Sequence, residues 1–454
     1  MTTAPPAGAH PASESARRDR FAGVWTKIVR GEPLVIVLAF VAAFVIGSLL
    51  ILISDEQVRA TAGYLFARPS DFFVAAWNAI TGAYLAMFHG AVFDSNGFTR
   101  VADQVRAQGG SGMYVWGPAL ARGFKPLTET LTVATPLIIA SCGIAVSFRA
   151  GLFNIGGTGQ LIAGAVASTW VGFALHLPPV VHLLVAIVAG VVAGALWGGI
   201  AGFLKARFGA NEVISTIMLN WIAVYGLAFL LTQKAFIGPD SAQPTSLSID
   251  PTAQLPLLFG DQFRLHWGIL LAVVAVVFLW WLMSRSTLGF RFRAVGSNPR
   301  AAEVAGIDTG RSALGVMLVA GALVGLAGAT HVLGTEYRLN GSIAGTIGFD
   351  AITVALLGRS GPVGIVLAGL LFAGLGTGGA FMESAQGVPK DLITVIQALV
   401  VLFIAAPPLM RAMIGQRPVR KPRRPRRGRG AGDPATASQQ QTVAAATSTT
   451  GAAS

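Results

Sequence analysis

The segment VVHLLVAIVAGVVAGALWGGIAGFL (Val180–Leu204) contains 25 residues, and His182 is its only titratable side chain. A helix needs roughly 20 apolar residues to cross a bilayer core of about 30 Å, so this segment predicts a transmembrane helix. Small residues at every fourth position let two such helices approach closely. That spacing occurs here and in a later apolar run, at Gly190, Gly194 and Gly198 and at Gly321 and Gly325.

The composition predicts an all-α, polytopic membrane protein. Of the 454 residues 53% are hydrophobic and only 12% are charged, which is too little polar surface for a soluble domain of this size. Apolar runs long enough to cross a membrane predict about ten transmembrane helices, some of them broken or re-entrant. They lie at 33–53, 127–147, 159–177, 180–204, 213–232, 267–283, 313–333, 346–358, 362–382 and 390–406.

Basic residues predict the orientation of these helices. The net charge is +13, but the basic residues separate apolar runs instead of forming one face, so no nucleic-acid partner is expected. Placing both termini in the cytoplasm puts 23 of the 33 Lys and Arg residues there, as the positive-inside rule requires. The predicted regions are an N-terminal tail (1–32), a retained anchor (33–53), an external segment (54–126), a core (127–406) with a cytoplasmic loop (284–312), and a basic, disordered tail (407–454).

The external segment contains a further apolar run, residues 72–93. Its polar interruptions favour an amphipathic helix that stays outside the membrane. A crossing at this point would move every later loop to the opposite side, including the basic clusters, and the charge rule argues against that.

The loop segment FRFRAVGSNPRAAEVAG (Phe290–Gly306) predicts a docking site for a soluble cytoplasmic partner. Asn298 suits an N-cap, Pro299 suits the first helical position, and Gly306 suits a left-handed stop. The resulting helix has about two turns, which is marginal when isolated in water. We therefore expect it to rest on another surface.

Two glycine-rich interruptions, Gly151–Gly159 and Gly345–Gly364, fit either broken helices or tight cytoplasmic turns. Irregular backbone at membrane depth is tolerated where it is buried or lines a cavity, and paired breaks are typical of a transporter's substrate route. If both interruptions are turns, they only join neighbouring helices.

Residue types that are absent or scarce limit the chemistry. The sequence has no Gly-Lys-Ser or Gly-Lys-Thr for a P-loop and has a single cysteine, Cys142, so neither nucleotide hydrolysis by that route nor a disulfide within the chain is expected. The carboxylates of the predicted spans lie near the ends of those spans. A proton or sodium relay would need such groups inside the spans, so the sequence does not favour one. These carboxylates are Glu129, Glu212, Asp350 and Asp391.

Three alternative functions follow from other features. Gly358–Gly361 (GRSG) resembles the surroundings of a rhomboid protease serine, with His331 as a possible base, but Ser360 and His331 are predicted at opposite ends of their spans, whereas catalysis needs about 3 Å. A stand-alone secondary transporter of a small polar solute would use an ion gradient. A membrane scaffold would not need the glycine-rich breaks.

Four blocks carry a family resemblance: Phe148–Gln160, Asn211–Asn220, Arg293–Ile307 and Gly348–Gly358. In them the chain resembles permease subunits of bacterial ABC importers of the branched-chain amino acid and simple-sugar superfamily, most closely those for nucleosides or simple sugars. The resemblance covers roughly residues 125–406. Where the family often has an acidic residue, this chain has Thr158.

The resemblance implies a multi-pass protein of the bacterial plasma membrane that is not itself an enzyme. Its partners would be ATP-binding subunits that use ATP and Mg, a second permease chain, probably a different one, an external substrate-binding lipoprotein, and the lipid bilayer. No cofactor or metal is expected on this chain. Coupling to the ATP-binding subunits is expected at Gly296, Ser297, Asn298, Pro299, Arg300, Ala301, Ala302, Glu303 and Gly306. Candidate residues of the substrate pathway are Phe153, Asn154, Gln160, Asn220, Trp221 and Gln397.

Overall fold

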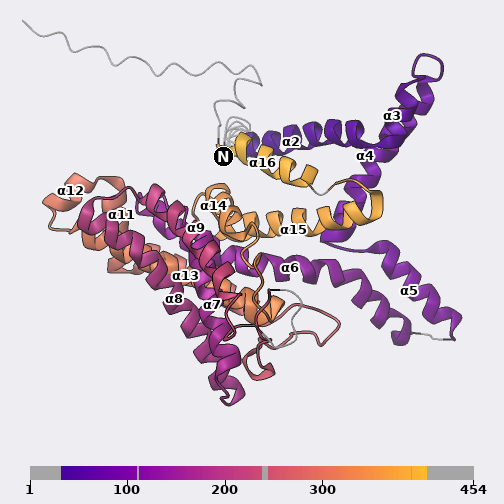
Figure 1. Cartoon of the computed structure of the whole chain (residues 1–454). Coiled ribbons are helices and arrows are strands. Elements are labelled where there is room, and N and C mark those ends of the chain that lie inside the picture. Colours follow the sequence, from indigo (N-terminus) through magenta and orange to yellow (C-terminus); the bar gives the residue numbers. More distant parts are fainter. Residues whose placement is uncertain (1–31, 110–111, 238–243, 390, 406–454) are drawn as a thin grey trace, which may run out of the picture. The chain divides into compact units, whose positions relative to one another are not determined.

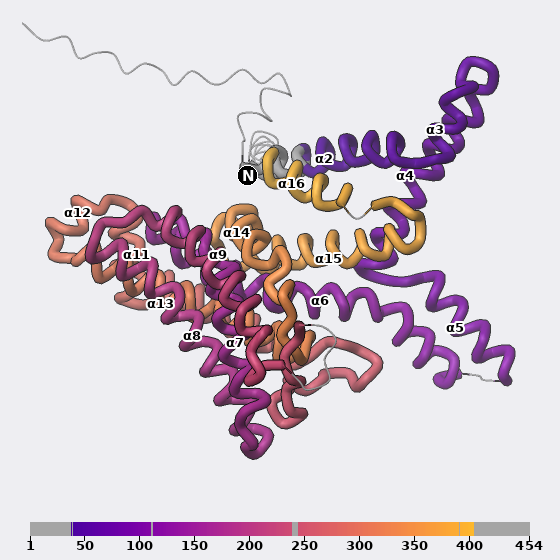
Figure 2. Tube along the Cα trace, viewed as in Figure 1, coloured from indigo at the N-terminus to yellow at the C-terminus, as the bar shows by residue number. Residues whose placement is uncertain are grey.

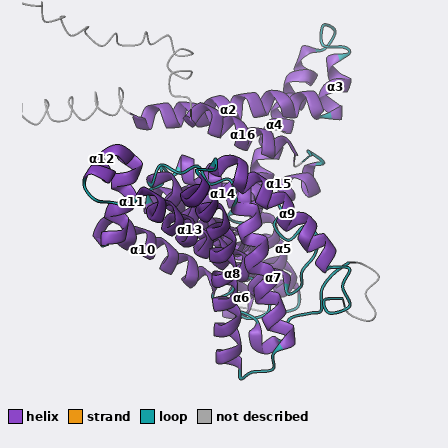
Figure 3. Ribbon diagram, turned by 60° about the vertical axis from the view of Figure 1, so that its left-hand side comes forward, coloured by secondary structure: helices purple, strands orange, loops and turns teal. Residues whose placement is uncertain are grey.

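A computed structural model describes residues 32–109, 112–237, 244–389 and 391–405. Within these residues the chain is built from helices joined by loops, with two isolated β-bridges (Figures 1, 2 and 3). The predicted tails, 1–32 and 407–454, lie outside the described residues except for Glu32. The helices are α2 (Glu32–Ser54), α3 (Glu56–Ala62), α4 (Pro69–Ala91), α5 (Ser95–Ala107), α6 (Met113–Arg149), α7 (Gly157–Ala174), α8 (Pro179–Phe208), α9 (Glu212–Leu230), η1 (Pro251–Ala253), α10 (Gly268–Arg285), α11 (Thr287–Ser297), α12 (Pro299–Val304), α13 (Thr309–His331), the π-helix η2 (Val332–Glu336), α14 (Ile347–Leu357), α15 (Pro362–Gln386) and α16 (Asp391–Ala405).

Short polar side chains and prolines explain where many helices begin. The carboxylate of Asp308 accepts a hydrogen bond from Arg311 N at the start of α13, which satisfies a donor that the helix itself leaves free. Proline occupies the first helical position of α8 and α15, where no amide hydrogen is needed. Gly209 ends α8 with a left-handed φ of 65°, a conformation that glycine adopts at little cost.

The number of crossings differs from the sequence estimate. Seven helices among the described residues are long and apolar enough to cross a membrane, or eight if the bent pair Phe40–Ser54 and Glu56–Ala62 forms one span. The predicted crossing at 346–358 is α14, which has only 11 residues and rises about 16 Å. It reaches about half-way through a hydrocarbon core of about 30 Å. The all-α, polytopic class is confirmed.

The predicted external segment contains α4, which packs along α15 and also contacts α2. By length and composition α4 is one of the candidate spans. Only 17% of its most apolar stretch is buried inside the chain. The external placement of residues 72–93 stays a prediction.

The predicted close approach of glycine-bearing helices is confirmed for α8 and α13. A Cβ atom added at Gly194 would lie 2.5 Å from the Cα of Gly325, and one added at Gly198 would lie 2.6 Å from the carbonyl oxygen of Met317. Real Cβ atoms do not approach backbone atoms this closely. The two helices therefore touch backbone to backbone, at the centre of a bundle that α6 and α7 complete (Figure 1).

The connection between α9 and α10 is hydrogen-bonded to the irregular backbone that follows α13. Ser246 N donates to Leu339 O (2.9 Å), Ile249 N to Tyr337 O (3.0 Å) and Leu255 N to Leu333 O (2.9 Å). These bonds satisfy backbone groups that the helix end leaves unpaired. They fix the segment between η2 and α14 from one side.

Candidate coupling surface and solute pathway

The docking helix predicted around Asn298 is present as α12. The Asn298 side chain accepts a hydrogen bond from Ala301 N (3.1 Å), Pro299 is the first helical residue, and Gly306 has a φ of 79°. All three capping predictions are confirmed. Ala302 is buried against the protein, whereas Val304 is 91% exposed, so α12 rests on one face and presents an apolar side chain with the other.

Gly296, two residues before this cap, contacts the end of a long helix. A Cβ atom on Gly296 would lie 2.6 Å from the carbonyl oxygen of Arg149, the last residue of α6, and 2.9 Å from the amide nitrogen of Gly151. Gly151 itself has a φ of 73°, in the region that favours glycine. The docking loop is therefore in direct backbone contact with the connection between α6 and α7.

Arg149 joins a third connection to the same place. Its Nε donates a hydrogen bond to the carbonyl oxygen of Ser360 (2.9 Å) in the turn between α14 and α15. Arg359 and Ser360 both adopt positive φ angles, 51° and 53°, which are uncommon for residues with a side chain. The Arg149 guanidinium thus stabilises the α14–α15 turn, whose backbone angles are unfavourable.

A cavity of about 500 Å³ lies at the same end of the core and is lined by the ends of further helices. Lys205 from the end of α8 and Asp308 from the start of α13 line it together with Gly296 and Pro299. The basic loops that the charge rule assigned to the cytoplasm therefore gather at one end of the core. We call this end the coupling surface, comprising α12, residues 149–151, 205–212 and 358–361.

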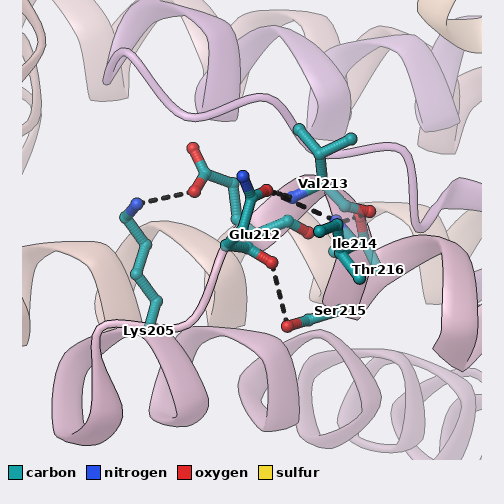
Figure 4. A network of polar contacts seen from close by, with 7 residues as sticks. Lys205, Glu212, Val213, Ile214, Ser215 and Thr216 are labelled. Carbon is teal, nitrogen blue, oxygen red and sulfur yellow. Dashed lines mark hydrogen bonds and ion pairs between the residues drawn. The ribbon is translucent and has the colours of Figure 1, made fainter.

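The α8–α9 connection on this surface is fixed by an ion pair and a cap (Figure 4). Lys205 Nζ lies 2.6 Å from Glu212 Oε2, and the Asn211 side chain accepts from Val213 N (2.9 Å) and Ile214 N (3.4 Å). Ser215 Oγ donates to the Asn211 carbonyl oxygen (3.0 Å). These bonds hold the two helix ends together at the membrane boundary.

Three of the predicted pathway residues come together behind this surface. Asn154 and Gln160 form a reciprocal pair of amide hydrogen bonds, each of 3.4 Å. Asn220 Oδ1 accepts from Gly159 N (2.8 Å) and its Nδ2 donates to Ile155 O (2.8 Å). All three are buried, and their polar groups hold the irregular Gly151–Gly156 backbone, which favours a structural role.

Two other predicted pathway residues point away from this cluster. Phe153 is 45% exposed and its ring lies 5.0 Å from that of Phe148. Trp221 is 54% exposed and stacks on Tyr225, with ring centroids 5.9 Å apart. Both rings are therefore partly exposed, outside the buried amide cluster.

The remaining pathway residue, Gln397, lines a cavity of about 220 Å³ between α6, α14, α15 and α16. Asp350 and Thr346 line the same cavity, and Thr346 Oγ1 donates to Asp350 Oδ2 (2.6 Å). Leu137 also lines it, twelve residues before Arg149 in α6, a rise of about 18 Å. The cavity therefore lies about three turns of α6 or more from the coupling surface.

Asp350 was not predicted as a site residue. Asp350 lies in the first turn of α14, near a helix end as the sequence predicted, but α14 is too short to cross a membrane. Its sequence, IGFDAITVALL, is as apolar as a full span, so hydropathy gave no sign of this. The signal was the glycine-rich segment before it, which the broken-helix alternative uses.

The geometry of the coupling surface also separates the two residues of the protease alternative. Ser360 accepts from Arg149 at this surface, where α13 begins at Thr309. His331 is the last residue of α13, 22 residues further on and thus about 33 Å along the helix axis. A serine and its base must be within hydrogen-bond distance, so this pair is not a catalytic dyad.

The core combines backbone contacts between glycine-bearing helices, a helix of half the crossing length beside a cavity, and a capped helix exposed at one end. Residues 127–405 match the family model described as branched-chain amino acid transport system / permease component. The chain belongs to this family. It is a multi-pass membrane protein of the permease class, and no enzyme activity of its own is part of that description.

Named relatives are similar over most of their lengths. The guanosine ABC transporter permease protein NupP of Bacillus subtilis is 38% identical over 317 residues, which is 67% of this chain and 91% of the relative. The glucose ABC transporter permease protein TsgB13 of Haloferax volcanii is 40% identical over 61% of this chain and 75% of its own length. The nucleoside ABC transporter permease protein NupB of Lactococcus lactis is 37% identical over 64% and 82%. No solved structure gives a significant match.

Proposed function

We propose that this chain forms half of the membrane pathway of an ATP-driven importer for a nucleoside or a simple sugar. The relatives named for guanosine, nucleoside and glucose transport support this solute class. The observation that carries the mechanism is the exposed, self-capped α12 together with Gly296, which lies in the last turn of the preceding helix α11 and touches the end of α6. A partner that moves α12 would move the α6–α7 connection with it.

In this proposal separate ATP-binding subunits dock on the coupling surface and bind ATP and Mg, and this chain binds no cofactor. Gly296–Glu303 and Gly306 form the contact. The exposed Val304 suits an apolar pocket on the partner, and Arg300 suits an acidic rim. Closure of the ATP-binding subunits pushes α12, and the push reaches α6 through Gly296 and the α14–α15 turn through Arg149.

The remaining partners complete the assembly in the bacterial plasma membrane. A second, different permease chain supplies the other half of the pathway, and an external lipoprotein delivers the solute. The buried amides of Asn154, Gln160 and Asn220 keep the α6–α7 connection in one conformation, so that it transmits the movement instead of deforming.

Reconstitution in proteoliposomes tests this function. The complete complex is expected to take up guanosine or glucose only with ATP and Mg inside the compartment that holds the ATP-binding subunits. Uptake should persist when ionophores abolish proton and sodium gradients. ATP-independent uptake that follows an ion gradient would instead establish the stand-alone secondary transporter.

A further inference from the structure

The cavity between α6, α14, α15 and α16 holds a carboxylate with unused hydrogen-bonding capacity. Among the described residues, Thr346 is the one polar partner of Asp350, and it donates to only one of the two carboxylate oxygens. A carboxylate has about four acceptor positions. The half-buried carboxylate lines the cavity, so a ligand that enters can donate hydrogen bonds to its free acceptor positions.

The rest of the cavity lining contains both polar and apolar side chains. Gln397 and Thr394, three residues apart on α16, line it, and the Gln397 amide makes only a long bond of 3.3 Å to Phe372 O. Val133, Leu137 and Phe372 supply the apolar wall. The volume, about 220 Å³, is below the range of pockets for drug-sized ligands and suits one small molecule.

We propose that this cavity is a solute site selective for neutral molecules with vicinal hydroxyl groups, with Asp350 as the residue that recognises the two hydroxyls. Two adjacent O–H groups can donate to one carboxylate, and such charge-assisted bonds are stronger than neutral ones. The apolar wall accepts the C–H face of a sugar ring or a base. The same negative charge repels phosphorylated solutes. This inference rests on the proposed importer function.

The ribose of a nucleoside and a free hexose share this diol chemistry, so the test uses guanosine and glucose separately. The readout is protection of a cysteine introduced at Thr394 (Thr394→Cys) against a methanethiosulfonate reagent, in the purified complex without the lipoprotein. The natural Cys142 is fully buried, so the otherwise unchanged complex serves as the unlabelled control.

Guanosine or glucose at millimolar concentration is expected to slow labelling, whereas 2′,3′-dideoxyguanosine, 2,3-dideoxyglucose and guanosine monophosphate are not. Asp350→Asn in the same background should abolish protection and lower ATP-driven uptake about tenfold or more, the loss typical of a bond to a charged group. Asp391→Asn, a matched change at an exposed position of α16, should alter neither.

Protection by the dideoxy compounds, protection by sodium ions alone, absence of labelling, or unchanged behaviour of Asp350→Asn would each overturn the site. These failures are distinguishable from failure of the importer function. If the complex takes up guanosine or glucose with ATP while Asp350→Asn is unaffected, only the site is wrong. If neither solute is taken up, the proposed function fails as well.

Discussion

Gly296 and Arg149 are in such close contact that a methyl group on Gly296 would lie 2.6 Å from the Arg149 carbonyl oxygen. This contact joins the docking loop to the longest described helix of the core, α6, with 37 residues. No side chain intervenes, so the contact has little freedom to deform. In the proposed importer it is the shortest route from a cytoplasmic partner to the membrane-spanning part.

We expect Gly296→Ala to weaken this route. The added methyl must displace backbone atoms, and overpacking of this kind costs about 1–3 kcal/mol. The thermal unfolding temperature of the purified complex should fall, and ATP hydrolysis should continue with less solute uptake per ATP. Gly226→Ala is the matched control, because a Cβ there meets nothing within 4 Å. Equal behaviour of the two variants would show that the contact transmits nothing.

Changes on α12 itself should separate ATP hydrolysis from transport. Gly306→Pro replaces a residue with a φ of 79° by one restricted to about −65°, and Arg300→Glu reverses an exposed charge. Both variants should insert normally, whereas solute uptake should fall about tenfold through loss of the partner contact. Uptake and ATPase activity in proteoliposomes measure this. Arg68→Glu, outside the coupling surface, should retain coupling; wild-type coupling in both α12 variants would exclude α12 as the contact.

The glycine contacts between α8 and α13 should be intolerant of side chains. Gly198→Leu places atoms where the Met317 carbonyl oxygen lies, and no rotamer avoids a clash that begins at Cβ. The expected result is loss of the folded protein or a loss of about 3 kcal/mol or more in stability, read as recovery in detergent and thermal unfolding. Gly376→Leu serves for comparison, since nothing lies within 4 Å of its Cβ. Full stability of Gly198→Leu would contradict the backbone contact.

Acidification should destabilise the protein through His266. This side chain is fully buried, its Nδ1 accepts from Gly268 N (3.1 Å) and its Nε2 lies 3.3 Å from Thr335 Oγ1. Burial, His331 and Arg264 lower its pKa to about 4. Between about pH 6.5 and 4 the unfolded chain therefore binds the proton and the folded chain does not, so stability is complete above pH 6.5 and falls as the pH drops.

Over that interval the lowered pKa of His266 corresponds to about 3 kcal/mol of the free energy of unfolding. Thermal unfolding of the purified protein from pH 7 to pH 4.5 measures it, with His266→Gln expected to flatten the pH dependence. His176→Gln, at a side chain that is 82% exposed, should leave it unchanged. A pH profile that is identical in all three proteins would rule out His266 as the responsible group.

Cysteine labelling in sealed cells tests the orientation on which the coupling argument depends. Ser297→Cys should be reached only by membrane-permeant reagents, because the charge rule places 284–312 in the cytoplasm. Ser70→Cys, in the external segment, should react with an impermeant reagent. The fully buried Cys142 should not contribute. Reaction of Ser297→Cys with the impermeant reagent would place α12 outside the cell and remove the docking proposal.

The sequence alone predicted those features that depend on residues close together in the chain. The cap at Asn298, the proline after it and the left-handed Gly306 lie within nine residues, and each acts on backbone groups beside it. The glycine spacing of α8 likewise identified a contact face before its partner was known. Both features depend on short-range periodicity, which a single sequence contains.

Long-range arrangement could not be derived in this way. Hydropathy measures the apolar character of α14 but not its surroundings, so it did not show that Asp350 lines a cavity. Asn154 and Gln160 could equally have faced solute. Only the folded positions of Thr216 and Asn220, about 60 residues away in sequence, show that this turn is bound to α9.

The interlocked backbones of α8 and α13 also limit how the core can change shape. Sliding one helix past the other would force glycine Cα atoms over carbonyl oxygens with no flexible side chains to give way. The two helices should then move as one rigid body and bend only at their ends. A displacement of the helix pair near Gly306 would therefore be transmitted almost undiminished to His331 and the loops around it, about 30 Å away.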